Sequence, residues 1–289
     1  MLEARWIDLK VIFITGITGT LGTELTRQLI VNEGTDIIYG LSRTEQKIKE
    51  FPYRDHERVK LLLGDIRSFE YQDYLKDVTH IIHAAALKHV DLSEEFPQEY
   101  IKTNIDGTQL LLELCESFKA NFIYVSTDKA VNPINAYGMT KALAEKLVLA
   151  SPLENKVICR YGNVIGSNGS AIKLFIDLIK NDIPISITDK QMTRFWISIE
   201  DAAKFIINNL SNISNKVQIP NMRSCYVIDL IKYLYNKLGK TNIMTQGKIR
   251  PGEKIHECLG KNYYSDDEES LLSPDEIPAY FDNKIEKFL

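Results

Sequence analysis

Three glycines that directly follow the first apolar run are the feature that most constrains the fold of this chain. Residues 11–15 are mainly apolar, and Gly16, Gly19 and Gly22 follow at intervals of three residues. Glycine lets a backbone approach a pyrophosphate closely, and a helix after the turn would direct free amides toward the same charge. This order is typical of a dinucleotide site; the alternative is a glycine-rich turn that binds no nucleotide. The turn predicts cofactor contacts at Gly16, Thr18, Gly19, Thr20, Leu21 and Gly22.

Short apolar runs alternate with longer amphipathic stretches through the first half of the chain. This is the pattern of parallel strands joined by crossover helices, and six strands suit a doubly wound sheet. The fold class is therefore predicted to be α/β. We expect a helix over residues 21–31 and strands over residues 11–15, 37–41, 59–63, 79–83, 122–126 and 156–160.

The regular alternation ends after residue 162. A loop rich in glycine and serine follows, then a helix is expected over residues 171–181, and prolines interrupt the remainder. We predict a cofactor-binding domain over residues 1–162, with a return segment at 195–212, and a smaller mixed α/β substrate domain over residues 163–289.

Charge, cysteine spacing and hydropathy limit the classes of partner that this chain is expected to bind. The 289 residues carry a formal net charge of -4, which provides no basic excess for a nucleic-acid backbone. The four cysteines lie far apart without a Cys-x-x-Cys pair, so we expect reduced thiols and no metal site. The first apolar run is far too short for a signal or membrane-spanning segment. We therefore expect a cytoplasmic protein that has no membrane partner.

The end of the second strand favours NADP as the cofactor. Ser42 and Arg43 stand where an NAD-binding protein more often places an acidic residue for the ribose hydroxyls. Arg43 can pair with an additional ribose phosphate, although a surface arginine of no consequence is the alternative. Further cofactor contacts are expected after the third and fourth strands, at Asp65, Ile66, Ala84, Ala85, Ala86 and Lys88.

A tyrosine and a lysine one helical turn apart form the first reactive pair. Tyr137 and Lys141 share a helix face, and a neighbouring ammonium lowers the pKa of a phenol by stabilising the phenolate. Tyr137 could then take a proton from a substrate hydroxyl while hydride leaves for a nicotinamide. A tyrosine and a lysine at this spacing are often only surface neighbours, so a catalytic role depends on where the pair lies in the fold.

Polar residues at the end of the fifth strand supply the second reactive group. Thr127, Asp128 and Lys129 lie at the carboxyl edge of the sheet, where doubly wound folds place their ligands. A hydroxyl, a carboxylate and an amine are predicted to meet there, and an ordinary salt bridge is the alternative.

Together these motifs resemble the extended short-chain dehydrogenase/reductase family, whose members combine a Rossmann domain with a smaller substrate domain. Residues 126–138 are similar to the signature of its inverting UDP-N-acetylglucosamine 4,6-dehydratases. Three later segments also resemble that subgroup, at residues 160–167, 187–197 and 249–254.

The resemblance implies a dehydratase with an internal redox cycle on NADP. Tyr137 would be the base at the carbon 4 hydroxyl, Lys141 would tune it and bind the nicotinamide ribose, and Thr127 would orient the hydroxyl. Asp128 would protonate the departing hydroxyl, and Lys129 would remove the proton of carbon 5. The product would be an inverted L-arabino 4-keto-6-deoxy sugar for deoxy-amino-sugar and glycan biosynthesis.

The same resemblance implies a UDP-sugar partner and a homo-oligomer. A guanidinium can bind a diphosphate through two hydrogen bonds, which suits Arg194 and Arg250. Substrate contacts are expected at Lys88, Asn163, Lys173, Arg194, Arg250 and Glu253.

Two other functions remain open from the sequence. A sugar-nucleotide 4-epimerase or 4-reductase would need Tyr137 and Lys141 but not the Asp128–Lys129 pair. A non-catalytic NADP-binding protein on this fold belongs to a different class, because fold alone does not give function.

Overall fold

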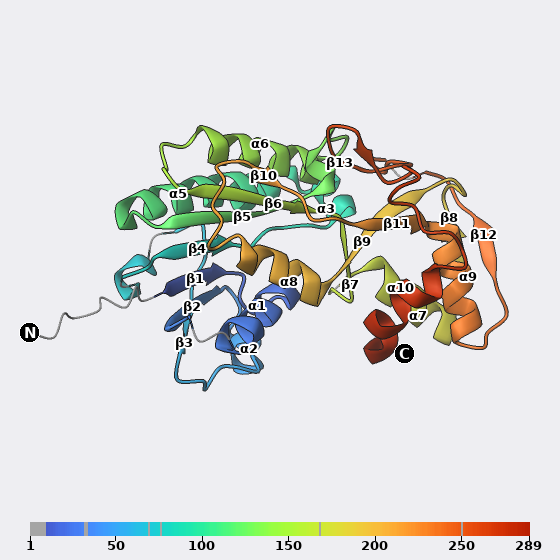
Figure 1. The fold of residues 1–289 in the computed structure, drawn as a ribbon, viewed down its shortest axis with the longest axis horizontal. Helices are drawn as coiled ribbons and strands as arrows, with labels where there is room; N and C mark the ends of the chain where they lie inside the picture. Colours follow the sequence, from blue (N-terminus) through green and yellow to red (C-terminus); the bar gives the residue numbers. More distant parts are fainter. Residues whose placement is uncertain (1–9, 32–33, 69, 76, 168, 250) are drawn as a thin grey trace, which may run out of the picture.

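The protein is described by a computed structural model that covers residues 10–31, 34–68, 70–75, 77–167, 169–249 and 251–289. A parallel seven-stranded sheet occupies the N-terminal part (Figure 1), with strand order β10-β6-β5-β4-β1-β2-β3. Its strands are β1 (Val11–Thr15), β2 (Ile37–Ser42), β3 (Val59–Leu63), β4 (His80–His83), β5 (Asn121–Thr127), β6 (Lys156–Tyr161) and β10 (Val217–Gln218).

The sheet confirms the predicted fold class and adds one strand. Six strands lie where the apolar runs predict them, within one residue at each end. The seventh, β10, pairs with β6 at the edge of the sheet, through Val217 opposite Ile158. Every residue of β1 is buried, because helices cover both faces of a parallel sheet.

Two helical layers enclose the sheet. On one face, α1 (Thr20–Val31) packs against α8 (Ile199–Asn208), and both contribute to the core of that face (Figure 1). On the opposite face, α5 (Gly107–Phe118) and α6 (Ala136–Ala150) contribute to the second core. The remaining N-terminal elements are α2 (Glu45–Lys49), α3 (Val90–Glu95), α4 (Pro97–Ile101), the short helices η1 (Gln72–Tyr74) and η3 (Asp128–Ala130), and the π-helix η2 (Lys102–Asp106).

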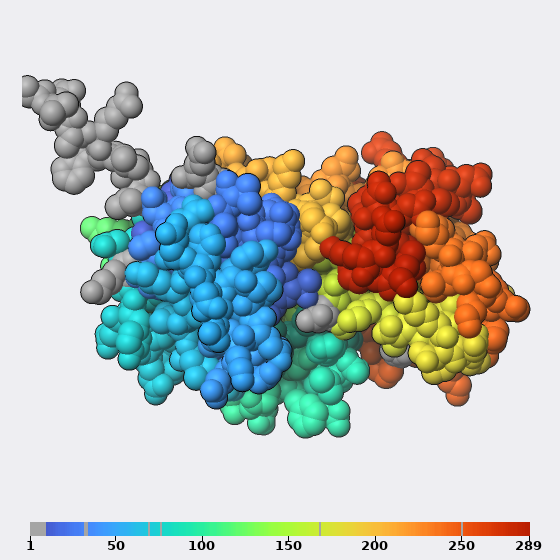
Figure 2. Space-filling model, turned by 90° about the horizontal axis from the view of Figure 1, so that it is seen from below, coloured from blue at the N-terminus to red at the C-terminus, as the bar shows by residue number. Residues whose placement is uncertain are grey.

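The C-terminal part has small sheets and a separate core. Its sheets are β11-β9-β7, β12-β8 and β13-β14. Figure 2 shows this orange and red part beside the blue N-terminal part. Its strands are β7 (Asn163–Ile165), β8 (Ile185–Ile187), β9 (Thr193–Ser198), β11 (Arg223–Tyr226), β12 (Met244–Gln246), β13 (Cys258–Gly260) and β14 (Tyr263–Tyr264). Its helices are α7 (Ala171–Lys180), α9 (Val227–Lys237), α10 (Ile277–Ile285) and η4 (Glu286–Phe288).

The chain crosses back to the large sheet after its first C-terminal strands. Helix α8 lies within the predicted return segment, and its Ala202, Ala203 and Ile206 are buried in the same core as α1. The predicted domain boundary near residue 162 stays a prediction.

Helix α6 begins where a side chain can cap it. Asn135 is the N-cap residue, and its Oδ1 accepts a 2.7 Å hydrogen bond from the Gly138 backbone NH. Its amide donates a 2.8 Å hydrogen bond to the Gly252 carbonyl. The helix that carries Tyr137 and Lys141 is thus tied to the C-terminal segment. Among the described helices, none is long and apolar enough to cross a membrane.

Candidate active site

The glycine turn has the geometry that a pyrophosphate requires. Gly16 has a φ of +72°, and a Cβ there would lie 3.0 Å from the Ala85 Cα. At Gly22 a Cβ would lie 2.4 Å from the Ile17 carbonyl oxygen, because the first turn of α1 packs directly on the loop. The start of α1 lines the same space, so its backbone amides and the positive end of its dipole fit the diphosphate of a dinucleotide.

An open cavity of about 660 Å³ runs from this turn to the end of β5 and on to β7. It brings together most of the predicted site residues. Lining residues among them are Gly16, Thr18, Gly19, Thr20, Leu21, Gly22, Ser42, Arg43, Ile66, Ala84, Ala85, Ala86, Lys88, Thr127, Lys129, Tyr137, Lys141 and Asn163.

The second strand ends at a cationic mouth of this cavity. Arg43 lies 4.0 Å from Asp65, measured from Nη1 to Oδ2. Asp65 is outside the cavity lining and pairs with Arg67 at 2.7 Å. Burial raises the pKa of Asp65, but hydrogen bonds from Arg67 lower it by a larger amount. The net shift of this pKa is therefore downward. Lys47 also lines the cavity, and the sequence reasoning missed it.

Tyr137 and Lys141 are both buried, and burial dominates their titration. It raises the pKa of Tyr137 to about 12, against the opposing effects of Lys129 and of a hydrogen bond with Thr127. Burial also lowers the pKa of Lys141 to about 7, against the charge of Glu145. The expectation that the neighbouring ammonium leaves Tyr137 with a lowered pKa is therefore wrong for this structure, because loss of solvent outweighs the charges.

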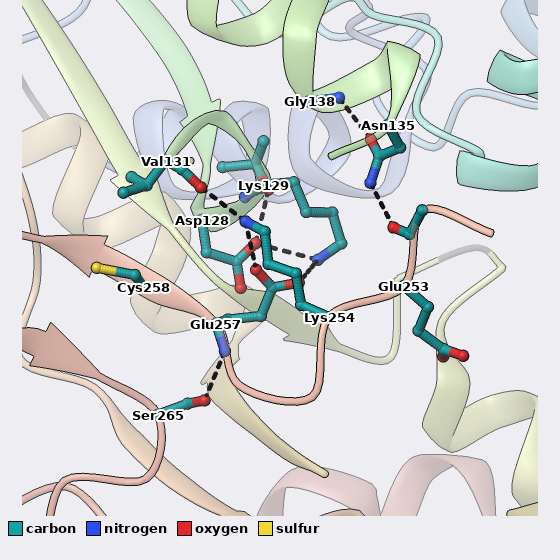
Figure 3. A network of polar contacts seen from close by, with 12 residues as sticks. Asp128, Lys129, Val131, Asn135, Gly138, Glu253, Lys254, Glu257, Cys258 and Ser265 are labelled. Atoms are coloured by element: carbon teal, nitrogen blue, oxygen red, sulfur yellow. Dashed lines mark hydrogen bonds and ion pairs between the residues drawn. The ribbon is translucent and has the colours of Figure 1, made fainter. Parts of the chain in front are cut away.

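Asp128 and Lys129 form a buried ion pair directly after β5 (Figure 3). Asp128 Oδ1 lies 3.0 Å from Lys129 Nζ and also accepts a 2.9 Å hydrogen bond from Thr127 Oγ1. Lys129 Nζ donates to Asn163 Oδ1 at 3.3 Å. Asp128 is fully buried, and its Oδ2 has no hydrogen-bond partner among the described residues. Lys129 is the member of the pair that faces the cavity.

A second carboxylate reaches Lys129 from the C-terminal part. Glu257 Oε1 lies 3.7 Å from Lys129 Nζ, and its Oε2 lies 3.2 Å from Lys254 Nζ. Burial lowers the pKa of Lys129, but Asp128 and Glu257 outweigh it and raise the pKa. The sequence reasoning gave Glu257 no role, because only its position just after the predicted nucleotide segment could have drawn attention to it.

Several predicted substrate contacts lie away from the cavity lining. Arg194 donates to the carbonyls of Thr193, Lys254 and Ile255 at 2.7–2.9 Å, and thus supports the segment that carries Glu257. Lys173 is exposed on α7, and Glu253 lies 4.0 Å from Arg194. Arg250 lies outside the described residues. The substrate-binding roles of Lys173, Arg194, Arg250 and Glu253 stay predictions.

Metal chemistry has no visible basis in the part of the chain that the structure describes. No group of three or more His, Cys, Asp or Glu side chains there could hold a metal ion. The four cysteines are free and buried.

The chain matches known proteins over most of its length. The family model described as polysaccharide biosynthesis protein matches residues 12–273. A UDP-N-acetylglucosamine 4,6-dehydratase (inverting) from Campylobacter jejuni is 39% identical over 263 residues, which cover 86% of this chain and 77% of the relative. A UDP-glucose 4-epimerase from Rickettsia bellii is 40% identical over 266 residues, with the same coverage of both chains.

Solved structures share the whole architecture. Pen from Bacillus thuringiensis has a TM-score of 0.86 at 27% identity, covering 95% of this chain and 98% of that chain. DesIV, a dTDP-glucose 4,6-dehydratase from Streptomyces venezuelae solved with NAD bound, has a TM-score of 0.80 at 19% identity. That match covers 96% of this chain and 97% of DesIV, and identity at that level shows the shared fold alone. The chain therefore belongs to the polysaccharide biosynthesis protein family, within the extended short-chain dehydrogenases/reductases that include the inverting UDP-N-acetylglucosamine 4,6-dehydratases.

Proposed function

We propose that this protein is a UDP-N-acetylglucosamine 4,6-dehydratase that inverts carbon 5. The observation that carries the proposal is the Asp128–Lys129 pair, held at 3.0 Å beside the cavity that Tyr137 and Lys141 also line. Dehydration needs an acid and a base in addition to the redox pair, and the Asp128–Lys129 pair can supply both. The Campylobacter relative, 39% identical, has this activity in its name.

A nicotinamide dinucleotide is the cofactor that the glycine turn fits, and we infer that it is NADP. Arg43 and Lys47 at the cavity mouth support a ribose phosphate, since each carries a positive charge there. When bound, NADP would accept hydride from carbon 4 of the sugar and return it to carbon 6. Lys141 would meet the nicotinamide ribose.

Tyr137 acts as the base at the carbon 4 hydroxyl. Its phenol is protonated at rest, because burial raises its pKa to about 12. The phenolic proton passes to solvent in the open cavity before Tyr137 takes the proton of the carbon 4 hydroxyl, and Lys129 and Thr127, which both lower this pKa, favour its loss. Thr127 ends β5, so it can orient the sugar hydroxyl toward Tyr137.

Asp128 and Lys129 perform the elimination after exchanging one proton. In the ion pair the proton is on Lys129, so Lys129 must first pass it to Asp128 across their 3.0 Å contact. Neutral Lys129 then takes the proton of carbon 5, and Asp128, turning toward the cavity, protonates the carbon 6 hydroxyl, which leaves as water. A carbon–carbon double bond forms and the ion pair is restored. Inversion follows when carbon 5 takes a proton from solvent on the opposite face.

The alternative is a UDP-sugar 4-epimerase, which the Rickettsia relative at 40% identity favours. An epimerase needs Tyr137 and Lys141 to move one proton at carbon 4 and has no step for an acid–base pair at carbons 5 and 6. The buried Asp128–Lys129 contact argues for the dehydratase.

Incubation of the purified protein with UDP-N-acetylglucosamine in deuterated water tests the proposal. We expect loss of water, one deuterium at carbon 5 and an inverted ring, by NMR and mass spectrometry without added reductant. Lys129→Met should abolish deuterium uptake, whereas Lys204→Met, on the exposed face of α8, should not. Epimerisation at carbon 4 with carbon 6 unchanged would establish the alternative.

We also propose the homo-oligomer that the resemblance implies. Met139 and Leu143 on α6 are 54% and 49% exposed, and two copies of such a helix could bury each other's apolar side chains. Light scattering of the purified protein would measure the assembly.

A further inference from the structure

Glu257 is a buried carboxylate that the reaction described above does not use. It is 2% exposed and stands just before β13, in the C-terminal part of the chain. Each of its oxygens lies near a different ammonium, Lys129 at 3.7 Å and Lys254 at 3.2 Å (Figure 3). A buried carboxylate is costly unless paired, so this arrangement requires an interaction that compensates for burial.

The backbone of Glu257 is fixed on both sides. Its NH donates to Ser265 Oγ at 2.8 Å, and its carbonyl accepts from the Ser265 NH at 2.9 Å. Ser265 Oγ in turn lies 2.6 Å from Thr193 Oγ1 on β9. The carboxylate is therefore held at a set position against Lys129.

Lys254 ties the same segment to the loop after η3. Its Nζ donates to the Val131 carbonyl at 2.6 Å as well as pairing with Glu257. Glu257 is thus shared between Lys254 and Lys129, and Lys254 offsets part of its negative charge.

The groups whose charge affects Lys129 come from three elements and from the loop before β13. Asp128 on η3 and Glu257 favour its ammonium form, and Tyr137 on α6 acts weakly in the same direction. Burial and Arg194 on β9 oppose them. The two carboxylates prevail, and the net shift of the Lys129 pKa is upward.

We propose that Glu257 is a positioning residue for the dehydration step, which holds the Lys129 ammonium beside Asp128 until the two exchange their proton. The proposal rests on the function proposed above. Glu257 keeps the amine charged and in place in the resting enzyme, and Lys254 limits this effect. Removing Glu257 therefore reduces the fraction of Lys129 that is charged, and removing Lys254 increases it.

Competitive acylation measures this effect directly. The folded, substrate-free protein is treated with acetic anhydride at pH 8, and modification of Lys129 is read by peptide mass spectrometry, since only the neutral amine reacts. Glu257→Gln should raise acylation of Lys129 about tenfold, because loss of a neighbouring opposite charge lowers a pKa by about one unit. Lys254→Met should lower the acylation of Lys129. Glu268→Gln removes an exposed carboxylate in the C-terminal part of the chain and should leave this acylation unchanged.

Turnover supplies the second measurement. Glu257→Gln should lower kcat about tenfold or more while KM for UDP-N-acetylglucosamine stays within about twofold, because a displaced base slows chemistry rather than binding. A more reactive amine in a slower Glu257→Gln enzyme, together with reduced labelling in Lys254→Met, is a result that a purely structural role for Glu257 does not give.

The outcomes separate the two proposals. Unchanged acylation in folded Glu257→Gln, or increased acylation in Lys254→Met, overturns the role of Glu257, since simple opening of the site would increase labelling in both variants. If Glu257→Gln does not fold, the decrease expected for Lys254→Met decides alone. Failure of the wild-type protein to dehydrate UDP-N-acetylglucosamine refutes the proposed function, whatever the labelling shows.

Discussion

Lys141 Nζ lies 4.0 Å from the centre of the Tyr124 ring and donates a 2.7 Å hydrogen bond to the Val125 carbonyl. Both partners are neutral, so the amine has lost its water without gaining a directly paired carboxylate. These uncharged contacts do not offset the lost hydration, so burial lowers the pKa of Lys141 to about 7.

Lys141→Met should change how stability depends on pH. The folded-state pKa of about 7 lies below that of the unfolded chain, so between about pH 7 and pH 10 the unfolded chain binds the extra proton. Wild-type stability therefore gains from this group as pH rises, and the variant lacks that gain. We expect the stability of the variant relative to wild type to fall by about 1.4 kcal/mol per pH unit in this window. Urea unfolding at several pH values measures it, and a constant difference contradicts the account.

Tyr137→Phe should lower turnover by a factor of about 10² to 10⁴, the range for loss of a positioned acid or base. The ring stays in its buried site, where it meets Tyr100 edge-on at 6.5 Å, so the fold should be retained. Titration of NADP by fluorescence should give an affinity within about twofold of wild type. Tyr74→Phe, 67% exposed, is the matched control and should be fully active.

Arg43→Ala should weaken NADP binding about tenfold and leave NAD binding unchanged. Hydrogen bonds to a charged group contribute about 1.5 to 3 kcal/mol, and Arg43 is half exposed, so the lower figure applies. Arg54→Ala is a matched control, because both side chains are 47% exposed and Arg54 is outside the cavity lining. Isothermal titration with each dinucleotide would show the difference; equal losses for both would refute a ribose-phosphate contact.

Glu145→Leu should destabilise the fold by about 3 to 5 kcal/mol, the cost of leaving a buried charge unpaired. Glu145 accepts from Ser126 Oγ at 2.6 Å and pairs with Arg160, whose side chain is 13% exposed. The double variant with Arg160→Met should recover most of the loss, because it removes the stranded charge. Urea unfolding of both variants measures this, and a double variant no more stable than the single one speaks against the pairing.

Local patterns were enough to predict the large sheet. The glycine spacing and the six apolar runs depend on side chains close together in the chain, and parallel strands buried on both faces need continuous apolar runs. Strand β10 escaped prediction because its two residues are half buried and its pairing with β6 depends on a distant segment.

Local patterns predict which chemical groups reach the cavity, because the glycine turn, Tyr137, Lys141 and Lys129 follow strand ends or lie in the helices after them. The charges of these groups, and the side chains around them, depend on how distant parts of the chain pack. Burial, a property of the packed molecule, raises the pKa of Tyr137 and lowers that of Lys141. Glu257 reaches Lys129 from another part of the chain at 3.7 Å, and no local pattern encodes such a contact, because its energy depends on the distance and the solvent that folding sets.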